Sequence, residues 1–138
     1  MKFVFNEEKN EERRRMLMMQ PTVEEGKALL AKDDTDAYAW YVYGKALSIQ
    51  KNYEAAIEAH SHGIACDPFY APNYFGRGGK MSVTGRLWSA LADYSMALHL
   101  DSSNWLYWYY RATTLNLAGY LEELSLIHIS EPTRPEPI

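Results

Sequence analysis

Large and small apolar side chains recur along the chain at the spacing of amphipathic helices. From Trp40, apolar residues follow at three, four and seven positions, which places them on one face of a helix. When the chain is aligned with itself so that position 40 falls on 74 and position 74 on 108, large residues fall on large ones and small on small. The aligned sets are Trp40 with Tyr74 and Trp108, Gly44 with Gly78 and Ala112, Ala56 with Ala90, and Gly63 with Ala97. This periodicity predicts helical hairpins that repeat at this one offset and pack through these positions.

Turn-forming residues mark where the predicted helices begin and end. Asp36 stands at the position of a helix N-cap. Asp67 and Pro68 end a second helix, because proline cannot continue a helix and restrains the residue before it. We expect Gly85 and Gly119 to lie in the turns between the paired helices of the later repeats. Each repeat is therefore predicted to be a helix, a turn and a second helix.

The aligned residues resemble the signature of the tetratricopeptide-repeat (TPR) family, W-x2-L-G-x2-Y…A-x3-F…P. The two copies read Trp40-x2-Tyr43-Gly44-x2-Leu47, Ala56-x3-His60 and Pro68, then Tyr74-x2-Arg77-Gly78-x2-Met81 and Ala90-x3-Tyr94. Most departures keep the size class of the family position, but Arg77 does not. The resemblance covers residues 37–123 and implies an all-α, right-handed solenoid of helix-turn-helix units.

The chain divides into a leading segment, the repeats and a short tail. A charged helix is predicted at residues 6–20, and Thr22 and Glu25 have capping-box spacing ahead of a helix at 23–32. The predicted units are an N-terminal helical cap or half-repeat at 1–36, TPR 1 at 37–70, TPR 2 at 71–104, and a truncated TPR 3 at 105–123. Residues 124–138 resemble a translated sequencing-library adapter, which makes them a non-native tail; the alternative is a divergent second helix followed by a proline-rich end.

Composition narrows the classes of function. The 138 residues are 47% hydrophobic and 14% aromatic, which favours a packed core over disorder. A net charge of -4 gives no basic surface for nucleic acid or anionic membranes. The single cysteine, Cys66, excludes an intrachain disulfide and is expected to be a buried or partly buried thiol. Without a membrane-spanning run or a secretory signal, we expect a cytoplasmic protein.

No catalytic or metal-binding pattern emerges from the sequence. His60 and His62 are two residues apart, so on a helix they face different directions. The glycine-rich stretch 76–80 lacks the spacing of a phosphate-binding loop, and tight helix packing explains its glycines better. We therefore expect neither an enzyme nor a bound cofactor or metal.

The TPR resemblance implies that a partner protein or peptide binds in a concave groove lined by the first helix of each repeat. By that resemblance the groove residues are Tyr38, Tyr41, Lys45, Phe75, Ser82, Tyr109, Thr113 and Asn116. Members that clamp chaperone carboxylate tails carry Lys, Asn and Arg at such positions, whereas Lys45 is the sole cation here, so a two-carboxylate clamp is not expected. We hypothesise that Tyr41, Phe75 and Tyr109 anchor an apolar or mixed peptide. The alternative is that these rings pack on each other and on neighbouring helices.

The sequence is also compatible with a second class of function, a purely structural role. The repeats would then be a structural spacer or a dimerisation module of a larger protein. The first helix of the third repeat is apolar nearly all round, and its partner helix is missing, so we expect exposed aromatics and self-association there.

Overall fold

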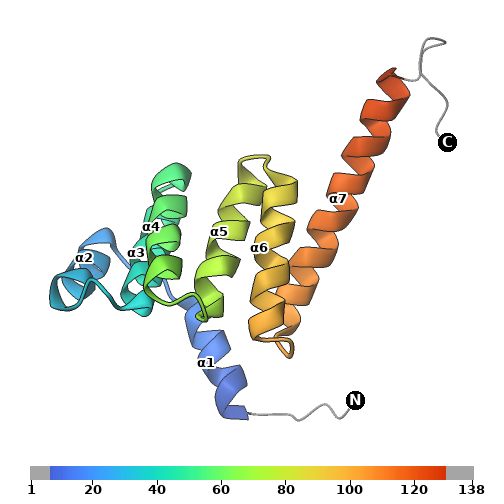
Figure 1. The fold of residues 1–138 in the computed structure, drawn as a ribbon. Helices are drawn as coiled ribbons and strands as arrows, with labels where there is room; N and C mark the ends of the chain where they lie inside the picture. Colours follow the sequence, from blue (N-terminus) through green and yellow to red (C-terminus); the bar gives the residue numbers. More distant parts are fainter. Residues whose placement is uncertain (1–6, 130–138) are drawn as a thin grey trace.

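The computed structural model describes residues 7–129, and this part of the chain is entirely helices and short turns (Figure 1). The helices are α1 (Glu7–Met18), α2 (Val23–Lys32), α3 (Ala37–Ile49), α4 (Tyr53–Cys66), α5 (Ala71–Val83), α6 (Leu87–Leu100) and α7 (Trp105–Ile129). The predicted all-α solenoid is confirmed. Most of the predicted tail, residues 130–138, lies outside the described residues.

The helix boundaries repeat with the period found in the sequence. Helices α3, α5 and α7 begin at Ala37, Ala71 and Trp105, so the step from each first helix to the next equals the sequence offset. Helices α4 and α6 begin at Tyr53 and Leu87, which are separated by the same step. In Figure 1 the α3–α4 hairpin, the α5–α6 hairpin and α7 follow one another as successive layers of a stack.

One hydrogen bond occurs three times at this period. The indole nitrogen of Trp40 donates to the carbonyl of Asp34 at 2.7 Å, and the hydroxyl of Tyr74 donates to the carbonyl of Pro68 at 3.0 Å. The indole nitrogen of Trp108 donates in the same way to the carbonyl six residues before it, at 2.8 Å. Each of these three positions holds an aromatic ring that carries an N–H or O–H donor. The hydrogen bond from this donor ties the first helix to the loop that precedes it.

Small residues bring the two helices of each hairpin close together. Ala56 and Ala90 are fully buried between them. A Cβ atom on Gly44 would lie 2.7 Å from the His60 ring, and one on Gly78 would lie 2.9 Å from the Tyr94 ring. The rings of the second helices therefore occupy the space that the glycines leave free.

The residues predicted to be packing positions differ in burial. Ala97 is fully buried and Tyr74 is 8% exposed, whereas Pro68 is exposed and Trp108 is 52% exposed. Pro68 follows the end of α4 in the connecting turn, and Trp108 lies on a helix that no second helix covers among the described residues. The ring at position 108 is therefore more exposed than the matching Trp40 and Tyr74, which belong to complete hairpins.

Arg77, which departs from the family size class, has a definite partner. Its guanidinium donates two hydrogen bonds to the Asp93 carboxylate, at 2.9 and 2.8 Å, and lies 5.9 Å from the Tyr74 ring centroid. The bond to Asp93 raises the pKa of Arg77. A charged pair thus replaces the apolar contact expected from the family pattern.

The structure agrees with several predicted helix ends and corrects one. Asp36 accepts a hydrogen bond from the Tyr38 amide at 3.0 Å, Glu25 donates its amide to the Thr22 hydroxyl, and Gly85 has a φ of 84°. The prediction of a turn at Gly119 is wrong, because α7 continues through it to Ile129. A glycine inside a helix costs only about 1 kcal/mol, and a turn becomes favourable only when a second helix packs back on the first.

Candidate functional site

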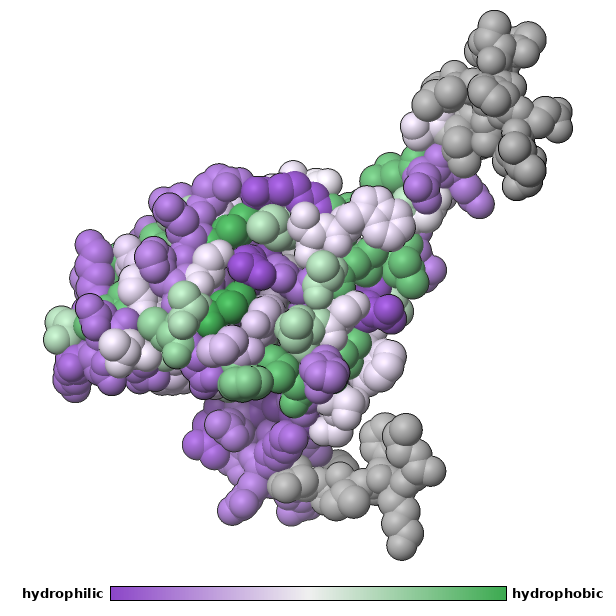
Figure 2. Space-filling view, in the orientation of Figure 1, coloured by the Kyte–Doolittle hydropathy of each residue, from purple (hydrophilic) through white to green (hydrophobic). Residues whose placement is uncertain are grey.

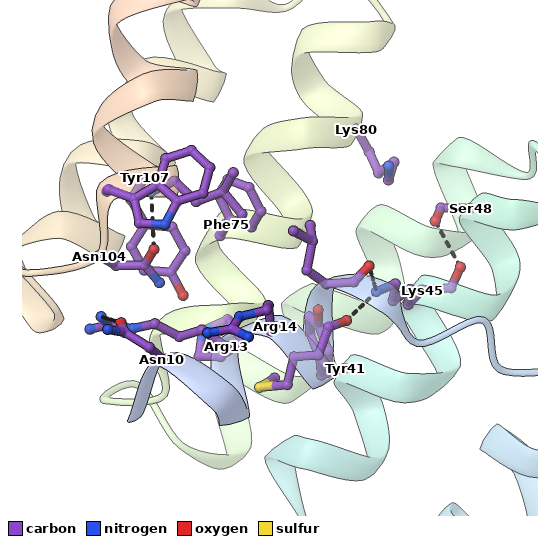
Figure 3. A pocket seen from close by; sticks show the side chains of 16 residues that line it. Asn10, Arg13, Arg14, Tyr41, Lys45, Ser48, Phe75, Lys80, Asn104 and Tyr107 are labelled. Carbon is purple, nitrogen blue, oxygen red and sulfur yellow. Dashed lines mark hydrogen bonds between the residues drawn. The ribbon is translucent and has the colours of Figure 1, made fainter. Parts of the chain in front are cut away.

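A cavity of about 560 Å³ lies on the side of the stack formed by the first helices of the hairpins (Figure 3). Helix α3 contributes Tyr41 and Lys45, α5 contributes Phe75 and Lys80, and the start of α7 contributes Leu106. Helix α1 forms the remaining wall. The cavity therefore draws on three successive first helices and on the segment that precedes the repeats.

Two sets of polar contacts hold α1 in this position. Near its end, the amino group of Lys45 donates to the carbonyl oxygens of Met16 and Leu17, the latter at 3.1 Å. These carbonyls have no partner further along the helix, so the lysine satisfies them. On the opposite side of the cavity, Arg13 donates to the Asp101 carboxylate at 2.7 Å and to the Ser103 hydroxyl at 2.9 Å. Helix α1 is thus bound to α3 near its end and to the α6–α7 turn through Arg13, near its middle.

The aromatic residues predicted to be anchors pack against other rings. Tyr41 is 8% exposed, and its ring centroid lies 5.9 Å from that of His60. Burial raises the pKa of Tyr41 to about 12. The Phe75 ring centroid lies 4.8 Å from that of Tyr107 and 5.2 Å from that of Tyr110. Tyr41 and Phe75 therefore belong to the interior of the solenoid and also line the cavity.

The charged residues around the cavity are all basic. Lys45, Lys80, Arg13 and Arg14 line it, and among residues 7–129 no carboxylate does. Partial burial lowers the pKa of both lysines, and the charge of Lys80 lowers that of Lys45 further. Carbonyl or carboxylate oxygens of a ligand would complement these donors.

The groove residues predicted from the TPR resemblance do not all meet at the cavity. Tyr41, Lys45 and Phe75 line it. Tyr38 instead points its hydroxyl at the Met19 sulfur, 3.9 Å away. The other four predicted residues do not line this cavity; they are Ser82, Tyr109, Thr113 and Asn116. Tyr109 is 57% exposed and makes an edge contact with Tyr110.

Several cavity residues were not predicted from the sequence. Lys80 lies four residues after Gly76, which also lines the cavity, so helical spacing alone is a signal that it shares that face. Tyr107 and Arg13 had no such signal, because their place depends on how α7 and α1 pack. The position of α1 is a tertiary feature that periodicity does not encode.

The remaining polar candidates have structural surroundings. His60 is 1% exposed, its Nδ1 lies 2.9 Å from the Asn73 side-chain oxygen, and burial lowers its pKa to about 4. Cys66 was expected to be at least partly buried, but it is exposed because it is the last residue of α4. Within the described chain no three His, Cys, Asp or Glu side chains are grouped to hold a metal ion. None of its helices has the length and apolar character needed to cross a bilayer.

The fold is that of known TPR solenoids. The structure of the first TPR of Spaghetti (RPAP3), bound to an HSP90 peptide SRMEEVD, matches with a TM-score of 0.67 at 16% identity, over 70% of this chain and 77% of that one. The crystal structure of MamA matches with a TM-score of 0.55 at 22% identity, over 83% of this chain and 68% of that one. No family model and no curated protein matches the sequence.

Proposed function

We propose that this protein is an interaction scaffold that binds a helical or extended segment of a partner protein on the side of the stack lined by α3, α5 and α7. The observation that carries the proposal is the position of α1 on this side of the stack. Lys45 holds this helix there by donating to two of its backbone carbonyls. The cavity between α1 and this side of the stack leaves apolar and basic side chains that a foreign segment can contact. The similar RPAP3 structure, which has a peptide bound, supports the same kind of role.

The chemistry of the cavity indicates what the segment must supply. Tyr41, Phe75 and Leu106 provide apolar surface, and Lys45 and Lys80 provide donors at its rim. A ligand with one or two apolar side chains beside backbone or side-chain oxygens would satisfy both. Tyr41 and Phe75 remain the proposed anchors, each presenting to the ligand the part of its ring that other rings leave uncovered.

The proposal is tested with peptides selected from a display library against the wild-type chain. Leu106→Glu places a carboxylate at the cavity, and Leu117→Glu places one at a site that is 46% exposed and outside the cavity. We expect Leu106→Glu to weaken the selected peptides roughly tenfold and Leu117→Glu to leave them unchanged. Circular dichroism confirms that both variants fold. Equal affinity in both variants for every selected peptide would exclude the cavity as the binding site.

A third variant tests how far the binding surface extends along the stack. Tyr109 was predicted to be an anchor, but it lies outside the cavity and is exposed, so Tyr109→Ala should leave the fold intact. Loss of affinity in this variant would extend the site along α7. Unchanged affinity would confine it to the cavity between α1, α3, α5 and the start of α7.

A further inference from the structure

The second complete hairpin shows how an arginine on a first helix is paired. Arg77 on α5 donates from Nε and one terminal nitrogen to Asp93 on α6, at 2.9 and 2.8 Å. Its other terminal nitrogen donates to the Ser61 hydroxyl on α4, at 3.3 Å. The guanidinium therefore joins the second helix of its own hairpin to the second helix of the preceding one.

Arg111 on α7 repeats only half of this arrangement. It occupies the position of Arg77 one repeat further along the chain, and Ser95 likewise occupies the position of Ser61. The Nε of Arg111 donates to the Ser95 hydroxyl at 3.1 Å. Within residues 7–129 no carboxylate forms an ion pair with Arg111. The contact with the preceding hairpin is therefore present, and the contact with a second helix of its own hairpin is missing.

The face of α7 around Arg111 is apolar and open. Trp108 is 52% exposed and Leu115 is 44% exposed, whereas the matching Tyr74 and Leu47 are 8% and 7% exposed in the complete hairpins. In Figure 1 no described helix lies on the outer side of α7, and Figure 2 shows apolar side chains gathering along it. An uncovered aromatic face beside a cation that lacks its carboxylate has the composition of a docking surface.

Ala112 restricts what this surface can accept. In the two hairpins the matching positions are Gly44 and Gly78, where a Cβ would approach the His60 and Tyr94 rings to 2.7 and 2.9 Å. Ala112 carries that Cβ, so a docking helix must present a small side chain where His60 and Tyr94 present rings. On α6, Tyr94 directly follows Asp93. The docking helix must therefore carry its small residue directly after its carboxylate.

We propose that the Trp108–Arg111–Leu115 face of α7 binds an amphipathic helix of a partner protein, which pairs a carboxylate with Arg111 and places a small residue directly after it against Ala112. This surface is separate from the proposed peptide site, because Trp108, Arg111, Ala112 and Leu115 do not line the cavity. Charge complementarity selects the acidic residue, and the Ala112 Cβ selects the small one that follows.

The test uses a peptide whose sequence the chain itself provides. A fluorescent peptide of residues 86–101 carrying Tyr94→Ala contains Asp93 followed by a small residue, and its binding to the full chain is measured by anisotropy. We expect Asp93→Asn in the peptide or Arg111→Ala in the protein to weaken binding roughly tenfold each, and the two together to weaken it little further, because they remove the same contact. Restoring Tyr94 in the peptide should also weaken binding.

Controls separate this surface from the other ways the peptide could bind. Arg15→Ala removes an arginine that is 75% exposed on α1, and it should leave affinity unchanged. If the peptide displaced the native α6 instead, Arg111→Ala would have no effect, and the proposal would be overturned. A free chain that sediments as a dimer, and becomes a monomer with Arg111→Ala, would show that a second copy covers this face, and this result would also overturn it.

Discussion

The complete hairpins and the single helix α7 share one register but differ in what covers their first helices. Tyr74 and Leu47 are buried by second helices, whereas the matching Trp108 and Leu115 are about half exposed. The Trp108 hydrogen bond to its preceding loop nevertheless forms as it does in the hairpins. The first helix and its loop are thus locally determined, and burial of its face depends on the second helix.

The same difference explains the length of α7. In the two hairpins the first helix ends after 13 residues, but α7 runs for 25. Gly85 takes a positive φ at its turn, while Gly119 remains helical. A glycine permits a turn without enforcing one, so the packing of a second helix decides whether the chain reverses.

The largest expected effect concerns the charged pair that α7 lacks among the described residues. Asp93→Ala removes the carboxylate from a site that is 7% exposed and leaves the Arg77 guanidinium partly buried without its counter-charge. We expect a loss of about 3 kcal/mol in the free energy of unfolding. Urea denaturation followed by circular dichroism measures it. A loss below about 1 kcal/mol would mean that water or Ser61 replaces the carboxylate, and that the pair does not fasten the hairpin.

Acidification tests His60, the buried histidine of the first hairpin. Burial first, and then the charges of Lys80 and Arg77, lower the pKa of His60 to about 4, and a hydrogen bond to Asn73 opposes this. The unfolded chain, with an ordinary pKa near 6.5, binds the proton more readily. The contribution of neutral His60 to the free energy of unfolding is therefore fully present above about pH 6.5. It is lost as the pH falls toward 4. Between pH 7 and pH 4.5 the loss should be about 2 to 3 kcal/mol.

The control for this prediction is a pair of histidine variants. His60→Gln keeps an amide that can bond to Asn73 but does not titrate, so its stability should vary less with pH over the same range. His62→Gln changes a histidine on the same helix that is exposed to solvent and should retain the full pH dependence. The assignment to His60 is wrong if the His60→Gln curve parallels that of the wild type.

Matched glycine substitutions contrast the interior of a hairpin with α7. A Cβ on Gly63 would lie 2.2 Å from the Asn73 side-chain nitrogen, which is buried and donates to the Ala37 carbonyl at 3.0 Å. Gly63→Ala should therefore destabilise the fold by about 2 kcal/mol. Gly119→Ala meets nothing within 4 Å and should stabilise α7 by roughly 0.5 to 1 kcal/mol. Urea midpoints compare the two, and a destabilising Gly119→Ala would indicate a close neighbour at that face.

The sequence predicted those features that depend on local patterns. The helix expected at 23–32 and the Asp36 cap are found where spacing and capping chemistry placed them. The position of α1 against the cavity was not predictable, because it depends on Arg13 reaching Asp101, 88 residues away along the chain. Tyr109 shares the register of Tyr41 and Phe75 but lies outside the cavity, which shows that register alone does not assign a groove residue.

The smallest expected effect is the one that most directly compares α7 with the hairpins. Arg111 has the register of Arg77, yet among residues 7–129 its side chain makes one exposed hydrogen bond, to Ser95. Arg111→Ala should therefore change the free energy of unfolding by less than about 0.5 kcal/mol. Ser95→Ala should have an equally small effect, and the double variant should show little further change, because both remove the same bond. A loss comparable to that of Asp93→Ala would mean that a carboxylate from a second copy, or from outside residues 7–129, already pairs with Arg111 in solution, and α7 would then be a covered helix like α5.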